Sequence, residues 1–119
     1  PGVVEALART AALLRADTEA LDSIAREHAT RLGSELDVDG LRSLPQAVRT
    51  RILRSAAIAA GARPGELTSW HIIRLDGLVA SRRSGACLHL PGVGVELSAG
   101  RVIFDSAGAR RRKEGRGRA

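Results

Sequence analysis

The stretch "GACLHLPGVGVELSAGRVIF", residues Gly85–Phe104, decides how the C-terminal half of this chain folds. Apolar and polar residues alternate along it, which is the pattern of β-strands with one buried face. Two turn sequences interrupt the alternation, Pro91-Gly92 and Ser98-Ala99-Gly100. The stretch therefore predicts a small antiparallel β-meander.

A long helix is predicted at the other end of the chain, over Val3–Leu32. Its apolar stripe follows alternating steps of four and three residues: Leu7, Ala11, Leu14, Thr18, Leu21, Ala25, His28 and Leu32. Leu13 and Ile24 widen this stripe beyond what one packing partner needs. Gly33 is a suitable residue to end the helix.

Two shorter helices are predicted between the long helix and the meander. The first begins at Leu44-Pro45 and runs to about Ala60, before Gly61. The second runs from Ser69 to about Ser81 with Thr68 as its N-cap. The predicted fold is therefore α+β and mostly helical, with a long N-terminal helix, two core helices and a small antiparallel meander.

Length and composition are those of one domain with one core, since the chain has 119 residues of which 44% are hydrophobic. The chain does not start with Met, and we interpret it as a piece of a longer protein. No apolar run is long enough to span a membrane. A single Cys excludes an internal disulfide and suits the reducing cytoplasm, where we expect this protein to be.

Charge is distributed unevenly along the sequence. Residues 1–40 carry four arginines and eight acidic residues, whereas residues 41–119 carry fifteen basic and five acidic residues. An excess of positive charge after residue 40 favours a polyanionic partner, most simply a nucleic acid. With only Trp70 and Phe104 as aromatics, such binding should rely on arginines that contact phosphates. The candidates are Arg42, Arg51, Arg54, Arg82 and Arg83, together with the basic tail.

No group of residues predicts catalysis or metal binding by this chain. Cys87 and His89 share one strand face, but one thiol and scattered histidines make neither a zinc site nor an activated nucleophile. We expect a buried structural Cys87 and a hydrogen-bonded core His71. The segment "SELDVDG" at residues 34–40, a loop or very short strand, imitates a calcium loop but lacks its key ligands. Acids before a helix are more often caps.

The helical wheel singles out three further groups of residues. Arg49 falls within the apolar arc of its helix, which predicts a buried partner for a carboxylate rather than a ligand contact. Arg51 and Arg54 lie opposite this arc and should be free to reach phosphates. Trp70, Ile73 and Gly77 form a second patch on their helix, and we expect Trp70 and Ile73 to contact another domain or partner there.

Three segments in this order resemble a known family. They are "LRSLPQAVRTRILRSAAIAAGA" at residues 41–62, "LTSWHIIRLDGLV" at residues 67–79 and "LHLPGVGVELSAGRVIF" at residues 88–104. Together they resemble the region after the catalytic domain in bacterial tRNA(Ile)-lysidine synthases, in the Arg/Ala-rich style of actinobacterial members. Where many members have a second Gly after Leu-Pro-Gly, this chain has Val93.

The resemblance implies part of an ATP-dependent ligase that joins lysine to the wobble cytidine of a minor isoleucine tRNA. The family's Ser-Gly-Gly-x-Asp-Ser ATP loop does not occur in this sequence, so no catalytic residue can be assigned and the chain alone should be inactive. ATP and Mg²⁺ are implied for the catalytic domain only. The implied role of this chain is to position tRNA(Ile).

The resulting division has three parts: a linker helix at residues 1–33, a tRNA-binding domain at residues 34–105 and an Arg/Gly-rich disordered tail at residues 106–119. The expected partners are tRNA(Ile) and the N-terminal catalytic domain of the same chain, and a homodimer is left open. Two alternatives also remain: a non-enzymatic protein–protein adaptor that binds through the Trp70 patch, or an unrelated helical nucleic-acid-binding domain.

Overall fold

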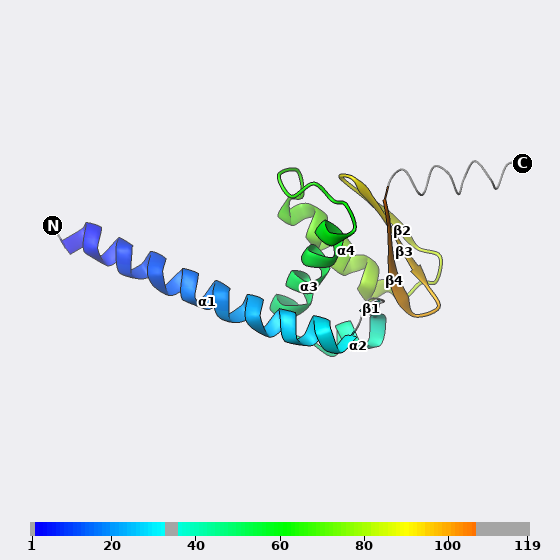
Figure 1. Ribbon diagram of the computed structural model, residues 1–119, viewed down its shortest axis with the longest axis horizontal. Helices are drawn as coiled ribbons and strands as arrows, with labels where there is room; N and C mark the ends of the chain where they lie inside the picture. The colour runs from blue at the N-terminus through cyan, green and yellow to red at the C-terminus, as the bar shows by residue number, and fades with distance from the viewer. Residues whose placement is uncertain (1, 33–35, 107–119) are drawn as a thin grey trace, which may run out of the picture.

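The computed structural model describes residues 2–32 and 36–106 (Figure 1). The helices are α1 (Gly2–Leu32), α2 (Val38–Arg42), α3 (Gln46–Ala59) and α4 (Ser69–Ser81). The strands are β1 (Leu36–Asp37), β2 (Cys87–Leu90), β3 (Val93–Ser98) and β4 (Arg101–Ser106). The mostly helical α+β fold predicted from the sequence is confirmed. Residues 107–119 of the predicted tail lie outside the described residues.

The predicted meander is present and is extended by one strand. All its pairs are antiparallel, and the sheet order is β1-β4-β3-β2. One face carries the buried residues, which pair across the strands as Leu88 with Val95 and Leu97 with Val102. The strand β1 joins the edge of β4 by pairing Leu36 with Val102. The short strand expected near residues 34–40 therefore exists, and its role is to close one side of the sheet.

The helix α2 follows β1 directly and was not predicted. Asp37 caps it, since its carboxylate accepts a hydrogen bond of 2.9 Å from the Gly40 N–H. The prediction that acids in this segment act as caps is thus confirmed for Asp37. Five residues with a central glycine give too weak a periodic signal for a helix to be recognised in the sequence.

Cys87 is exposed, so the prediction of a buried cysteine is wrong. Along β2 the exposed Cys87 and His89 alternate with the buried Leu88 and Leu90. Side chains alternate between the two faces of a strand, so burying both leucines forces the cysteine to the outer face. Its thiol donates to the Gly85 carbonyl at 3.2 Å.

The helices α3 and α4 supply the other half of the core. Their buried side chains are Val48, Ile52, Leu53 and Ala57 on α3, and Ile72, Leu75 and Val79 on α4. Two predicted helix ends are confirmed. Thr68 is the N-cap of α4, and Gly61, with a φ of +124°, follows the end of α3. The aliphatic faces of these helices and the sheet enclose one core between them.

Among the described residues, only the C-terminal part of α1 packs against the other elements. Ala25 is buried, and Leu21, Ala29 and Leu32 are partly buried against the core. In Figure 1 the N-terminal part of α1 extends well beyond the other elements. Its apolar side chains are exposed there, including Leu13 and Leu14. The apolar stripe predicted for the whole helix therefore packs against the core only along about its last three turns.

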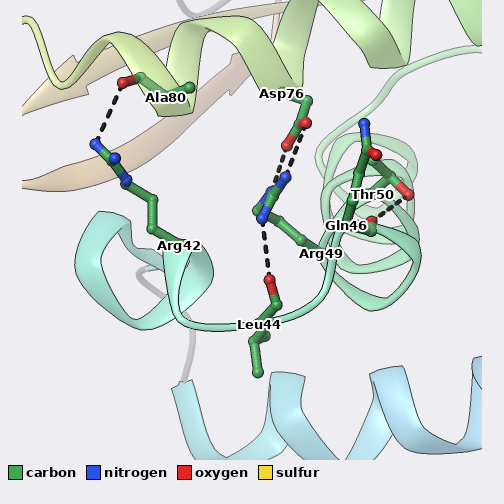
Figure 2. A network of polar contacts seen from close by, with 7 residues as sticks. All are labelled: Arg42, Leu44, Gln46, Arg49, Thr50, Asp76 and Ala80. Atoms are coloured by element: carbon green, nitrogen blue, oxygen red, sulfur yellow. Dashed lines mark hydrogen bonds and ion pairs between the residues drawn. The ribbon is translucent and has the colours of Figure 1, made fainter.

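A bidentate ion pair ties α3 to α4 (Figure 2). Arg49 donates from Nε and Nη2 to the Asp76 carboxylate at 2.5 and 3.0 Å, and from Nη1 to the Leu44 carbonyl at 3.0 Å. The side chains are mostly buried, with 18% and 13% exposed. The hydrogen bond to Asp76, aided by its charge, raises the pKa of Arg49. The predicted structural role of Arg49 is confirmed.

Candidate nucleic-acid interface

The structure divides the five predicted arginines into two groups. Arg42, Arg82 and Arg83 gather where α4 ends. Arg42 donates from Nη1 to the Ala80 carbonyl at 3.2 Å (Figure 2), and Arg82 forms an ion pair with Asp39. The carbonyl end of a helix carries partial negative charge, which attracts cations to this position. All three side chains remain exposed, so their unused N–H groups face solvent.

Arg51 and Arg54 lie on α3 and are not free, contrary to the expectation. Arg51 donates from Nε to Asp22 of α1 at 3.2 Å and from Nη1 to the Ala47 carbonyl at 2.9 Å. Arg54 donates from Nη1 to the Leu67 carbonyl at 3.0 Å. The helical wheel placed both residues away from the apolar arc, but α1 and the link before α4 pack beside that surface. A wheel describes one helix and does not show its neighbours.

These contacts leave part of each guanidinium available. A guanidinium has five N–H donors, and the hydrogen bonds described use two for Arg51 and one for Arg54. Both side chains line a groove of about 360 Å³ between α3 and α4. Its other lining residues are Thr50, Ser69, Ile72 and Ile73. The groove thus combines two cations and two hydroxyls with apolar side chains.

The predicted second patch of α4 is exposed. Trp70 is 58% exposed and Ile73 is 64% exposed. Because they are three residues apart on a helix, they form one exposed apolar patch. The guanidinium of Arg74 lies over the Trp70 ring, 4.8 Å from its centroid. Arg74 was not among the predicted site residues. Its position four residues after Trp70 on a helix was the signal that could have identified it.

The histidines and acidic residues show no catalytic arrangement within residues 2–32 and 36–106. His71 is partly buried, and its Nδ1 accepts from the Thr68 N–H at 3.0 Å, so it caps α4 rather than lying in the core. In these two ranges no three His, Cys, Asp or Glu side chains are grouped to hold a metal ion. The described helices also include none with the length and apolarity needed to cross a membrane.

Comparison with known proteins shows the family. Residues 36–103 match the TilS substrate binding domain. The tRNA(Ile)-lysidine synthase of Thermobifida fusca is 48% identical over 95 residues, which cover 77% of this chain and 29% of that protein. The enzyme of the same name from Streptomyces coelicolor is 44% identical over 107 residues, 87% of this chain and 30% of that protein. This chain thus spans about a third of the length of these relatives. The match over its folded body, from β1 to β4, shows that the chain belongs to the TilS substrate-binding domain family.

Proposed function

We propose that this chain positions tRNA(Ile) for a tRNA(Ile)-lysidine synthase. The observation that carries the proposal is the family match over residues 36–103, the region that contains both groups of arginines. The relatives named tRNA(Ile)-lysidine synthase extend the similarity along most of this chain. The reaction that follows is the ATP-dependent joining of lysine to the wobble cytidine of the bound tRNA.

The chemistry of the ligase belongs, in this proposal, to a catalytic domain of the same protein. That domain would hold ATP and Mg²⁺, and the working enzyme would act in the cytoplasm. This chain alone should release no pyrophosphate when it is mixed with ATP, lysine and tRNA(Ile). Pyrophosphate release by the purified chain, above that of a chain-free control, would contradict this division of labour.

Binding of tRNA should depend on arginines that contact phosphates. Each lost phosphate contact lowers the slope of log affinity against log salt by about one unit. We expect Arg82→Ala with Arg83→Ala to weaken tRNA binding and flatten this slope by about one to two units. Arg51→Ala with Arg54→Ala should do the same, with a loss of stability as well, because both side chains also hold Asp22 and Leu67 in place.

Filter binding at several salt concentrations tests this expectation. The charge-matched control is Arg9→Ala with Arg15→Ala, because both side chains are exposed and lie in the first half of α1. Equal affinity and equal slope in all three double variants would show that these arginines serve solubility rather than tRNA binding.

The exposed apolar side of α1 is the candidate contact with the catalytic domain. Val4, Leu7, Leu13 and Leu14 are exposed here, and they continue the stripe that packs against the core further along α1. Apolar surface of this kind is usually covered in the working protein. Hydrogen exchange in the first half of α1 should therefore be slower in a full-length synthase than in this chain. A second copy would also cover α1, and sedimentation of the chain alone distinguishes that case.

A further inference from the structure

We propose that the exposed stripe of α4, formed by Trp70, Ile73, Arg74 and Gly77, is a stacking platform for an unpaired base of the tRNA. This inference rests on the proposed function and specifies how the domain would contact unstacked RNA in addition to phosphates. Sequence alone assigned Trp70 and Ile73 to a contact with another domain. The surroundings of the two side chains in the structure favour RNA.

The four residues form one face of α4. They are spaced by three and four residues, so they lie along a single line on the helix surface. The opposite face is buried through Ile72, Leu75 and Val79. The stripe is therefore not required by the described core, and the helix would keep its packing if these side chains were polar.

Arg74 gives the platform a charge. Its guanidinium lies 4.8 Å from the Trp70 ring centroid, so the aromatic surface and a cation are held together. A nucleotide interacts favourably with both groups, because its base stacks on an aromatic ring while its phosphate attracts a cation. An apolar protein surface placed against Trp70 would instead have to bury the Arg74 charge.

The groove beside the stripe adds two further cations. Ile73 belongs to both the stripe and the 360 Å³ groove, which Arg51 and Arg54 also line. The acids nearby are engaged: Asp22 with Arg51, and Asp76 with Arg49 on the inner side of α4. Asp22 compensates the charge of Arg51, so the net positive charge beside the apolar centre comes from Arg54 and Arg74. Such a surface is complementary to an unstacked nucleotide with its flanking phosphates.

Gly77 leaves the helix backbone exposed at one end of the stripe. A glycine within a helix is less favourable than alanine by roughly 1 kcal/mol, because it has more freedom to lose on folding. A Cβ at this position would meet nothing within 4 Å, so the described packing does not require a glycine. A bare backbone at the end of the stripe allows an RNA strand to approach α4 closely.

The fluorescence of Trp70 provides a direct test, since it is the only tryptophan and the chain has no tyrosine. The 119-residue chain is titrated with an unmodified tRNA(Ile) transcript, and binding is measured in parallel by filter retention. A fully paired RNA duplex is the control, because it offers phosphates but no free base. We expect the transcript to quench Trp70 in step with binding, and the duplex to bind without comparable quenching.

Substitutions separate stacking from folding. Trp70→Phe should retain most of the tRNA affinity, whereas Trp70→Leu should weaken it by about 5- to 150-fold, the range for one stacked base. Gly77→Ala should raise the melting temperature yet weaken binding, so that reduced affinity cannot be attributed to unfolding. Gly65→Ala is the matched control, because a Cβ there also meets nothing within 4 Å and it lies in the link before α4.

The results of these experiments decide whether the α4 stripe stacks on an RNA base or contacts a protein. Transcript binding with no change in Trp70 fluorescence, or full affinity in Trp70→Leu, would overturn the platform and leave tRNA binding intact. The stripe would then belong to a protein contact. An absence of any binding to either RNA would overturn the proposed function together with the platform.

Discussion

At the scale of single residues, one ion pair joins the two core helices. Arg49 and Asp76 are 27 positions apart in the sequence and form two hydrogen bonds in the fold. Such a pair contributes little when both partners are exposed, but this one is mostly shielded from water. Removing one partner leaves the other charge buried without compensation, which costs more than the pair itself contributes.

Arg49→Ala should therefore lower the free energy of unfolding by about 3 kcal/mol. Asp76→Ala should have a similar effect. The free energy of unfolding lost by the double variant should be clearly less than the sum of the losses in the two single variants. Urea denaturation of the four proteins measures this coupling. Additive losses would show that the two side chains do not stabilise each other.

The direction of the Arg49 pKa shift determines how the stabilising effect of this ion pair depends on pH. The pKa of Arg49 is raised in the folded state, so its stabilising effect is complete below the unfolded pKa and is lost only at strongly alkaline pH. We expect the difference in melting temperature between wild type and Arg49→Ala to be constant between pH 6 and 9. A marked change over this range would point to a different titrating group.

Gly92 is required by the turn between β2 and β3. Its φ is +95°, and a Cβ at this position would lie 2.6 Å from the Gly61 carbonyl oxygen. Gly92→Ala should therefore destabilise the chain by about 3 kcal/mol, through backbone strain and a clash with rigid backbone. Gly100→Ala is the matched control, since its φ is +77° but its surroundings are open. The free energy of unfolding of Gly100→Ala, measured by thermal denaturation, should fall by only about 1 kcal/mol. Equal losses would mean that the close approach to Gly61 is unimportant.

At the scale of elements, α1 has two parts with different roles. The residues before Leu21 are exposed, and the packed residues begin at Leu21 and include the buried Ala25. Helical hydrogen bonds alone are marginal in water, so the first part should fray more readily than the second.

Deletion of residues 1–17 should therefore change the free energy of unfolding by less than about 0.5 kcal/mol. Circular dichroism should show less helix with an almost unchanged midpoint of the main transition. Ala25→Glu is the contrasting variant, because it places a charge in the contact between α1 and the core. A large loss of stability on deletion would mean that the exposed half of α1 supports the body.

At the scale of the whole molecule, folding and tRNA binding should respond differently to salt. The ion pairs of Arg63 and Arg82 are solvent-exposed to a large degree, so they contribute little to stability. Raising the salt concentration from 50 to 500 mM should leave the melting temperature nearly unchanged, while tRNA affinity should fall by orders of magnitude. Parallel thermal and filter-binding measurements test this, and a parallel fall of both would contradict it.

The sequence by itself determined the three longer helices, the meander and the family, but not the short helix α2. These features depend on local rules: the apolar period sets α1, α3 and α4, and turn residues set the hairpins. The wheel also identified Arg49 correctly, because a cation within an apolar arc requires a partner wherever that partner lies.

Only the tertiary structure decided which side chains are accessible. Cys87 is exposed because the leucines beside it take the inner face, and Arg51 and Arg54 are engaged because α1 and the link before α4 pack next to α3. Periodicity describes one element at a time, whereas accessibility depends on neighbours that are distant in the sequence, so these contacts could not be derived from local patterns.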